Sequence, residues 1–441
     1  QWLNQYSVLY SSNGVVFGAG FTDVTVNLIY FKVLVGALIV ESIILLVWAF
    51  RSGFLVPTFL GGGIVLLMII GGGLVPGFVQ SFFVTPNELA KESPYIKHNI
   101  DLTRKAYALD KIESAQFSAS DNLTKTSIKN NTDTLDNIRL WNQEPLRQTF
   151  SQLQEIRPYY EFSNIDVDRY DIDNRSQQVM LSPREIDINQ LTQPAQTWIN
   201  QRLVYTHGYG ACLSPVSQID SEGLPYFYLK DIPPVSNKNL KLVRPEIYFG
   251  EKSNHYVLAN TKQKEFDYPR GETNAYTHYQ GSGGIALNSL LKRLIYSFKF
   301  SDFKILISSL ITDDSRIMYD RNINEIVRNI TPFLVYDSDP YLIITRSGRM
   351  KWILDAYTIS NKYPYSKPYS RNVNYIRSAV KVVIDAYDGK TQFYKVSSVE
   401  DPIIETLSKV YTDLFIDDAE MPLEIKNHIR YPKDLFSVQM Y

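Results

Sequence analysis

The sequence of 441 residues contains one cysteine, Cys212, and only five histidines. A single cysteine excludes an internal disulfide and any zinc site built from several cysteines. The net charge of -1, from 45 basic and 46 acidic residues, gives no electrostatic indication of nucleic-acid binding. The HExxH, GxxxxGK[ST], GxGxxG and GxSxG signatures are also missing. These absences remove the most easily recognised metalloprotease, nucleotide-binding and hydrolase classes.

Charge is almost absent from two long apolar stretches near the beginning of the chain. Residues 29–50 read IYFKVLVGALIVESIILLVWAF and carry only Lys32 and Glu41, while residues 54–83 carry no charge at all. Each stretch has the roughly 20 residues that a helix needs to cross a membrane. We therefore predict two transmembrane helices, 29–50 and 54–83, which form a hairpin through residues 51–53. This topology places residues 1–28 and 84–441 on the same side of the membrane.

Two features of the predicted helices bear on function. Glu41 lies near the middle of the first helix, where an ionisable side chain is a candidate functional group. A proton or ion path, or a hydrogen bond to a neighbouring helix outside this chain, would each explain it. In the second helix, Gly62 and Gly73 are 11 residues apart and share one face, which predicts a glycine-lined helix contact.

Residues 84–441 are predicted to form a large extramembrane α+β domain, with a potential division into two subdomains near 240–285. The 31 tyrosines and 22 phenylalanines are typical of a β-rich body. Strands are predicted in 246–261, 340–358 and 380–396, with hairpin turns at Ser347-Gly348 and Asp388-Gly389. Helices are predicted near 146–153, from 195 and from 401, and as an amphipathic core helix within 285–310 that buries Leu287, Leu290, Leu291, Leu294 and Phe298. The polar stretch 115–134 is predicted to be a surface loop.

The stretch RLVYTHGYGACLSPV, residues 202–216, contains the weak catalytic candidate His207. Gly208 and Gly210 would let the backbone approach a bound oxyanion closely, but the same residues are typical of a sharp turn. Ser214 precedes a proline and has no evident base beside it. We therefore favour a turn after a helix that covers 195–206 over a catalytic role.

Acidic residues supply the weak candidates for metal binding. Four aspartates occur in DVDRYDIDN, residues 166–174, but strand geometry places Asp166 and Asp168 on one face and the other two on the opposite face. A solvated strand edge followed by an Asp-Asn turn is the stronger interpretation. The remaining candidates are Asp313 and Asp314, and Asp337 and Asp339, which folding would have to bring together. No cofactor is predicted.

Several ordered blocks of the sequence resemble a known family. They are YSSNGVVFGAGFTDV (10–24), VTPNELAKESPYIKHNI (84–100), NIRLWNQEPL (137–146), LQEIRPYYEF (153–162), RLVYTHGYG (202–210), KDIPPVS (230–236), RPEIYFGE (244–251), NTKQKEFDYP (260–269), YDSDPYL (336–342), WILDAYT (352–358) and RYPKDLF (430–436). Together they are similar to the bacterial and archaeal integral membrane proteins of uncharacterised protein family (UPF) number 0182.

The resemblance implies a multi-pass protein of the cell membrane with several N-terminal helices and a large extracytoplasmic domain. It also implies that this chain is a fragment, which holds the last two helices and most of that domain. The resemblance implies no activity and no catalytic residues.

Three hypotheses about function follow. The leading one is a non-enzymatic scaffold or assembly factor whose extracytoplasmic domain binds partners. The alternatives are a transporter or channel component that uses Glu41 and further helices, and an envelope hydrolase or metal-dependent enzyme around His207. The expected partners are the lipid bilayer and other membrane or envelope proteins, in a larger complex or a homo-oligomer. Nucleic acid is not expected.

Overall fold

The computed structural model describes residues 2–12, 14–49, 55–117, 119 and 121–441. The chain divides into two compact units. Unit 1 comprises Gln1–Gln116, Thr358–Arg377 and Leu435–Tyr441, and unit 2 comprises Phe117–Tyr357 and Ser378–Asp434. The predicted division into 1–28, 29–83 and 84–441 concerns membrane topology and stays a prediction.

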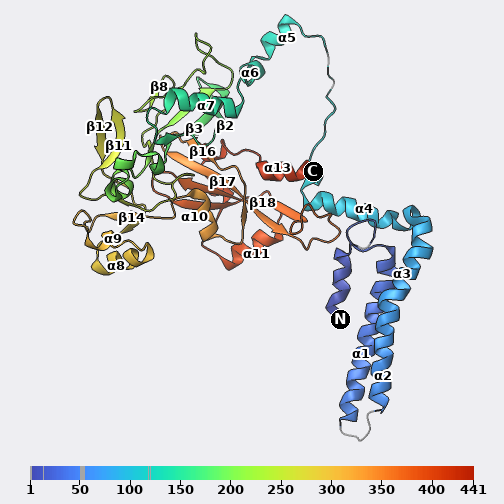
Figure 1. Cartoon of the computed structure of the whole chain (residues 1–441). Helices are drawn as coiled ribbons and strands as arrows, with labels where there is room; N and C mark the ends of the chain where they lie inside the picture. Colours follow the sequence, from blue (N-terminus) through green and yellow to red (C-terminus); the bar gives the residue numbers. More distant parts are fainter. Residues whose placement is uncertain (1, 13, 50–54, 118, 120) are drawn as a thin grey trace. The chain divides into compact units, whose positions relative to one another are not determined.

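Two apolar helices dominate unit 1. They are α1 (Leu28–Trp48) and α2 (Leu55–Ile69), which lie side by side in Figure 1. The chain continues from α2 through α3 (Val75–Val79), with a π-helical turn on either side of it, into α4 (Glu88–Ala106). The segments Asp23–Trp48 and Leu55–Ala106 are long and apolar enough to cross a membrane. These helices confirm the two predicted apolar spans and indicate membrane association. The predicted connecting loop, 51–53, lies outside the described residues.

The glycine contact in unit 1 differs from the predicted one. A Cβ added to Gly62 or Gly73 would meet no atom of the described residues within 4 Å. A Cβ on Gly71 would instead lie 2.6 Å from the ring of Tyr30, and one on Gly72 would lie 3.1 Å from its hydroxyl oxygen. The helices therefore meet where a tyrosine of the first one fills the space above adjacent glycines of the second.

Unit 1 also contains a segment from late in the sequence that packs on α4. The Asn99 side chain donates to the Tyr365 carbonyl at 2.7 Å, and the Tyr107 hydroxyl donates to the Lys367 carbonyl at 2.8 Å. Glu92 is buried and accepts the backbone N–H of Phe21. These bonds tie the start of the chain, α4 and residues 358–377 together.

Unit 2 contains two principal sheets. The five-stranded sheet has the order β2-β3-β6-β7-β8, and its strands are β2 (Asp166–Ile172), β3 (Arg175–Pro183), β6 (Ala211–Pro215), β7 (Leu229–Lys230) and β8 (Val235–Ser236). The six-stranded sheet has the order β15-β17-β18-β19-β20, and β16 also pairs with β17. Its strands are β15 (Val335–Tyr336), β16 (Tyr341–Ile344), β17 (Met350–Ser360), β18 (Tyr375–Asp385), β19 (Thr391–Lys395) and β20 (Phe415–Asp417).

The remaining strands form smaller sheets. The three-stranded sheet β10-β14-β13 contains β10 (Val257–Ala259), β14 (Arg316–Met318) and β13 (Ile285–Ala286). The pairs are β1 (Tyr160–Glu161) with β4 (Glu185–Ile186), β5 (Gly208–Tyr209) with β9 (Glu246–Ile247), and β11 (Glu265–Arg270) with β12 (Thr273–Thr277). Among the pairings with a described register, only β19 with β20 is parallel. The mixture of antiparallel sheets and helices confirms the predicted α+β class.

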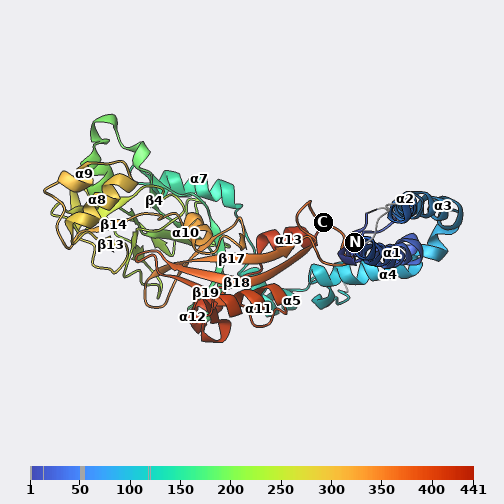
Figure 2. The same ribbon diagram turned by 90° about the horizontal axis from the view of Figure 1, so that it is seen from below.

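Both predicted hairpins are present, and their long strands β17 and β18 lie side by side in Figures 1 and 2. Gly348 turns between β16 and β17 with a φ of +77°, and Gly389 turns between β18 and β19 with a φ of +69°. Side chains with a Cβ rarely adopt this backbone conformation, so glycine at these positions favours the turns. In the predicted strand region 246–261, only the short strands β9 and β10 form.

A large apolar core joins the two principal sheets. Trp352 of β17 is fully buried, and its indole N–H donates to the Phe249 carbonyl at 3.0 Å. The same cluster contains Leu181 and Leu213 from the five-stranded sheet and Val382 from β18. The sheets therefore share one core, which fixes the loops at their ends relative to one another.

The helices of unit 2 agree in part with the predictions. They are α5 (Lys125–Asn130), α6 (Thr132–Leu135), α7 (Gln143–Gln154), α8 (Leu290–Lys299), α9 (Lys304–Ile307), α10 (Ile323–Ile330), α11 (Pro402–Val410) and α12 (Leu423–Lys426), and α13 (Lys433–Gln439) begins at its end. Short helices α5 and α6 replace part of the predicted loop 115–134. The helix α8 forms, but its leucine stripe is exposed rather than buried.

Candidate functional site

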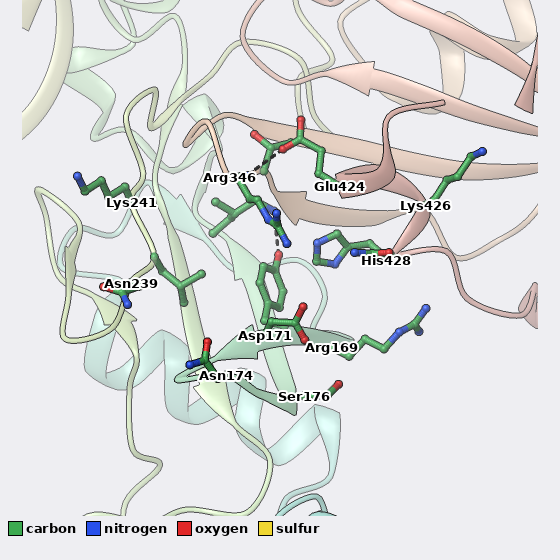
Figure 3. Close-up of a pocket in the computed structure, with 15 residues that line it drawn as sticks. Arg169, Asp171, Asn174, Ser176, Asn239, Lys241, Arg346, Glu424, Lys426 and His428 are labelled. Carbon is green, nitrogen blue, oxygen red and sulfur yellow. Dashed lines mark hydrogen bonds between the residues drawn. The ribbon is translucent and has the colours of Figure 1, made fainter. Parts of the chain in front are cut away.

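A polar cleft of about 920 Å³ opens on unit 2. Its lining comes from four segments: residues 169–176 of the β2–β3 hairpin, residues 239–241 after β8, residues 344–346 at the end of β16, and residues 424–428 around α12. Figure 3 places Asn239 and Lys241 on one side of the cleft and Glu424 and Lys426 on the other. The volume is in the range of sites that hold small ligands or a short polymer segment.

Two turns position the walls of the cleft. The β2–β3 hairpin reverses at Asp173 and Asn174, whose φ values of 52° and 61° are those of a tight hairpin turn. This confirms the predicted strand and its Asp-Asn turn, but the strand face that carries Asp166 and Asp168 is buried rather than solvated. Opposite, the Gly348 carbonyl accepts the backbone N–H of Val243 at 2.8 Å and so holds the segment that carries Lys241. The cleft is therefore preformed by backbone contacts.

A histidine and an aspartate form a pair at the floor of the cleft. His428 Nδ1 lies 2.6 Å from Asp168 Oδ2, and the imidazole packs on the Tyr170 ring with a centroid distance of 4.6 Å. The Tyr170 hydroxyl in turn accepts the backbone N–H of Ile344 at 2.8 Å. Because a carboxylate accepts hydrogen bonds, this bond fixes a proton on Nδ1, and Nε2 is the ring nitrogen that Asp168 does not engage.

Cationic side chains outnumber carboxylates in the cleft. Four cations line it, Arg169, Lys241, Arg346 and Lys426, against the two carboxylates of Asp171 and Glu424. Within the described part of the chain, none of these four cations lies within 4 Å of a carboxylate oxygen. Glu424 accepts the backbone N–H of Arg346 rather than binding its guanidinium. The positive charge of the cleft is therefore available to an anionic ligand.

Beside the cleft, Arg430 binds two of the predicted metal ligands. Its Nη2 lies 3.2 Å from Asp166 Oδ1 and 3.0 Å from Asp339 Oδ2, and its Nη1 donates to the Val167 carbonyl at 3.1 Å. The guanidinium also stacks on the Tyr341 ring at 3.9 Å. Burial raises the pKa of Asp166 to about 7, although Arg430 acts in the opposite direction. Folding thus brings Asp166 and Asp339 together around an arginine.

The other predicted metal ligands lie apart from one another. Asp168 binds His428, and Asp337 accepts the Tyr357 hydroxyl and the backbone N–H of Asp434. Asp313 forms a 3.0 Å ion pair with Arg293 on the surface, and Asp314 follows it in the same loop. In the residues that the structure describes, no three His, Cys, Asp or Glu side chains are arranged to hold a metal ion.

His207 lies in a buried network away from the cleft. Its Nδ1 is 2.8 Å from the Thr206 hydroxyl oxygen, and its Nε2 is 3.6 Å from Asp267 Oδ1 without a hydrogen-bond partner among the described residues. Glu265 organises this network by accepting four hydrogen bonds, from the Thr206 and Tyr248 hydroxyls and from the backbone N–H groups of residues 260 and 279. The surroundings of His207 are thus those of a core residue with acidic neighbours.

The glycines after His207 do not form the predicted turn. Gly208 belongs to β5, which pairs with β9. A Cβ on Gly208 would lie 2.6 Å from the Arg184 carbonyl oxygen, so glycine is required there by close packing. Gly210 has a φ of +75°. The predicted 195–206 helix is also shortened, since regular helical turns extend only over residues 198–204.

Glu41 lies on α1 at its contact with α2. A Cβ added to Gly61 would lie 3.8 Å from Glu41 Oε1, and Glu41 Oε2 is buried without a hydrogen-bond partner in the described part of the chain. The carboxyl group therefore faces the neighbouring helix, where a glycine leaves room for it.

Comparison with known proteins decides the family. A family model described as Uncharacterised protein family (UPF0182) matches residues 1–441. The chain belongs to this family. The chain is 50% identical over 438 residues to a UPF0182 protein of Desulforamulus reducens, covering 99% of this chain and 47% of the relative. It is 48% identical over 437 residues to one of Pelotomaculum thermopropionicum, covering 99% and 48%.

A third UPF0182 protein, from Trichodesmium erythraeum, is 45% identical over 466 residues, covering 100% of this chain and 50% of the relative. The chain thus spans about half the length of the curated relatives it matches. No solved structure matches the chain.

In this UPF0182 chain, sequence reasoning missed His428 and Arg346, which line the cleft, and Arg430, which lies beside it. His428 was one of five scattered histidines, and Arg430 and Arg346 were not singled out. A signal existed, because Arg430 begins the block RYPKDLF and Asp339 lies in the block YDSDPYL, both of which carry the family resemblance. The structure joins the two blocks through Arg430 and through the bond of Asp434 to Ser338.

Proposed function

We propose that the chain is part of a multi-pass membrane scaffold whose unit 2 lies outside the cytoplasm and binds an acidic segment of an envelope protein in the cleft. The observation that carries this proposal is the set of cleft cations without carboxylate partners among the described residues. Cations held at fixed positions around a concave site favour an extended anionic ligand. The apolar helices α1 and α2 support the membrane location.

The surroundings of His428 favour binding over catalysis. The His428 and Asp168 pair resembles the base and its orienting carboxylate in a hydrolase. Such a reaction also needs a nucleophile beside the histidine, and no serine, threonine or cysteine side chain hydrogen-bonds to His428 in the described residues. Cys212 is fully buried in another part of unit 2. The pair acts instead as a rigid polar floor that hydrogen-bonds a ligand.

A photo-crosslinking experiment in native membranes tests the proposal. A photoreactive amino acid replaces Asn239, which is exposed on the rim of the cleft, and a control replaces Glu222, which is exposed elsewhere on unit 2. We expect one discrete adduct at position 239 and none at 222. The double variant R346E/K426E should abolish the adduct, whose crosslinked peptide should be rich in Asp and Glu.

Three results would contradict the proposal. These are the absence of an adduct at position 239, an adduct that survives charge reversal, and a crosslinked peptide without acidic residues. An unchanged thermal midpoint of R346E/K426E shows that the variant is folded, so that a lost adduct reports the cleft itself.

A second candidate function is transport, favoured by the buried oxygen of Glu41 that lacks a hydrogen-bond partner among the described residues. A carboxyl group at this depth in a membrane helix is costly unless it has a role or a partner. Ion or proton flux into vesicles that contain the protein should then disappear in Glu41→Gln. An unchanged flux in this variant would remove Glu41 from consideration.

A further inference from the structure

Helices α8 and α9 carry large apolar side chains on an outer surface of unit 2. Both helices lie together at one end of the unit in Figures 1 and 2. Leu290, Leu291, Phe298, Phe303 and Ile307 are each 65% to 73% exposed, and Ile295 is 53% exposed. We refer to these six residues as the α8–α9 patch. Folding would normally bury such side chains, so a concentrated exposed group of them marks an interaction surface.

The inner side of the two helices explains why the patch faces outward. Tyr296 and Phe300 pack on Tyr319, and Ile305 is fully buried in the same apolar cluster. The predicted core helix therefore packs on unit 2 through Tyr296 and Phe300, and its leucines face outward. Burial of Leu287, which precedes the helix, is the part of that prediction that is confirmed.

Hydrogen bonds hold the patch in a defined shape. Ser289 caps α8 by accepting the backbone N–H of Lys292 at 3.3 Å. Asp302, between the helices, accepts the Trp198 indole N–H at 2.7 Å and the Tyr256 hydroxyl. The Ser297 hydroxyl donates to the Asp302 carbonyl at 2.8 Å. The exposed apolar side chains thus stand on a fixed helical platform.

The charge around the patch is positive. The helices and the turn between them contain the four cations Lys292, Arg293, Lys299 and Lys304; Arg293 is paired with Asp313 at 3.0 Å, and the carboxylate Asp302 is engaged with Trp198 and Tyr256. Lys299 and Lys304 are exposed, and Lys299 also lies 3.7 Å over the Tyr319 ring. Lys299 and Lys304 therefore place positive charge beside the exposed apolar side chains.

We propose that the α8–α9 patch inserts into the headgroup region of a bilayer that contains anionic lipids. Exposed leucine, isoleucine and phenylalanine flanked by lysine are typical of helices that bind a membrane surface. Protein interfaces share the enrichment in Phe but are depleted in Lys, which is present beside this patch. The anionic charge of the lipid headgroups complements the flanking cations, and α1 and α2 keep the same chain at a membrane.

A fluorescence experiment on the full chain in vesicles tests this proposal. Phe298→Cys is labelled with an environment-sensitive dye, and Glu222→Cys, exposed elsewhere on unit 2, is the matched control. The native Cys212 is fully buried and does not compete for the dye. Vesicles contain either phosphatidylcholine alone or phosphatidylcholine with phosphatidylglycerol, and carry a nitroxide quencher on the acyl chains.

We expect quenching of the dye at position 298 to be about threefold stronger with phosphatidylglycerol and to weaken at high salt. Position 222 should stay unquenched in both lipids. The variant K299E/K304E keeps the apolar side chains and should lose most of the quenching. A second label at Leu291→Cys should repeat the pattern, which guards against a local effect of the first substitution.

Absence of quenching at positions 298 and 291 in phosphatidylglycerol vesicles would overturn the proposal. Quenching that ignores lipid charge and K299E/K304E would also overturn it. If position 298 instead gave energy transfer between differently labelled copies without quenching by lipid, the patch would be an interface between copies of the chain, and the lipid assignment would be wrong. None of these outcomes depends on what the cleft binds.

Discussion

Replacing Arg430 with methionine removes the cation that binds Asp166 and Asp339 beside the cleft. Methionine keeps the aliphatic part of the side chain, so the change isolates the guanidinium. Asp166 is 2% exposed, and among the described residues it would retain only the backbone N–H of Leu342 at 3.1 Å as a donor. Removing one partner of a buried ion pair typically costs about 3–5 kcal/mol.

The loss should depend on pH. Burial raises the pKa of Asp166 from its ordinary 3.8 to about 7. The native state therefore holds a proton that the unfolded chain releases, and stability from this group falls as the pH rises through 3.8 to 7. Without Arg430 the native pKa rises further. We expect the full loss at pH 8, and only about 1–2 kcal/mol at pH 5.5, where Asp166 is already protonated.

Thermal unfolding in detergent, followed by tryptophan fluorescence, measures this loss at the two pH values. At pH 8 the midpoint of Arg430→Met should fall by on the order of 6–10 °C. The control Arg169→Met removes an exposed cation of the same cleft and should change stability by less than about 1 kcal/mol. Adding Asp166→Asn to Arg430→Met should recover stability at pH 8 but little at pH 5.5. Equal losses of stability in Arg430→Met at both pH values would refute the reasoning. It would also be refuted if a metal chelator lowered the unfolding midpoint of the wild type as much as the substitution does.

Two further changes test other parts of unit 2. Burial raises the pKa of Glu185 to about 7, so the stability of the wild type should fall as the pH rises from 5 to 8. The substitution Glu185→Gln should remove up to about 3 kcal/mol of that fall. Parallel pH profiles of the unfolding midpoint in wild type and variant would contradict this. Gly348→Ala should cost roughly 1–3 kcal/mol, because φ is +77° and the new Cβ would lie 2.7 Å from the Val243 nitrogen. Gly223→Ala, at φ +80° with no atom of the described residues within 4 Å, should cost less, and equal midpoints would exclude the steric contribution.

Elements with strong local signals were predictable from the sequence. The apolar spans, the β16–β17 and β18–β19 hairpins with their turn glycines, and α7 and α11 all follow from periodicity and turn chemistry. The short strand β5 was not predictable, because it has two residues and exists only through its pairing with β9. The outward orientation of α8 was missed since hydrophobic periodicity identifies an apolar face but not what covers it.

The cleft could be predicted only in fragments. Asp168 was placed on the same strand face as Asp166, but the burial of that face was not predicted, and its partner His428 is 260 residues away in the sequence. Asp166 and Asp339 were weak candidates for metal binding, whereas Arg430 lies between them. The aspartates indicated that they would bind a positive charge, and only the tertiary fold shows that this charge is the guanidinium of Arg430.

Direct titration of the cleft with an acidic peptide tests the central claim. The full chain in uncharged nanodiscs is titrated with a fluorescent deca-glutamate peptide, with deca-lysine as the control, and anisotropy is recorded at low and high salt. We predict saturable binding of deca-glutamate only, weakened by salt and reduced at least about tenfold in R346E/K426E, which corresponds to about 1.4 kcal/mol. Absence of deca-glutamate binding, or equal binding by wild type and R346E/K426E, would contradict an anion-binding cleft.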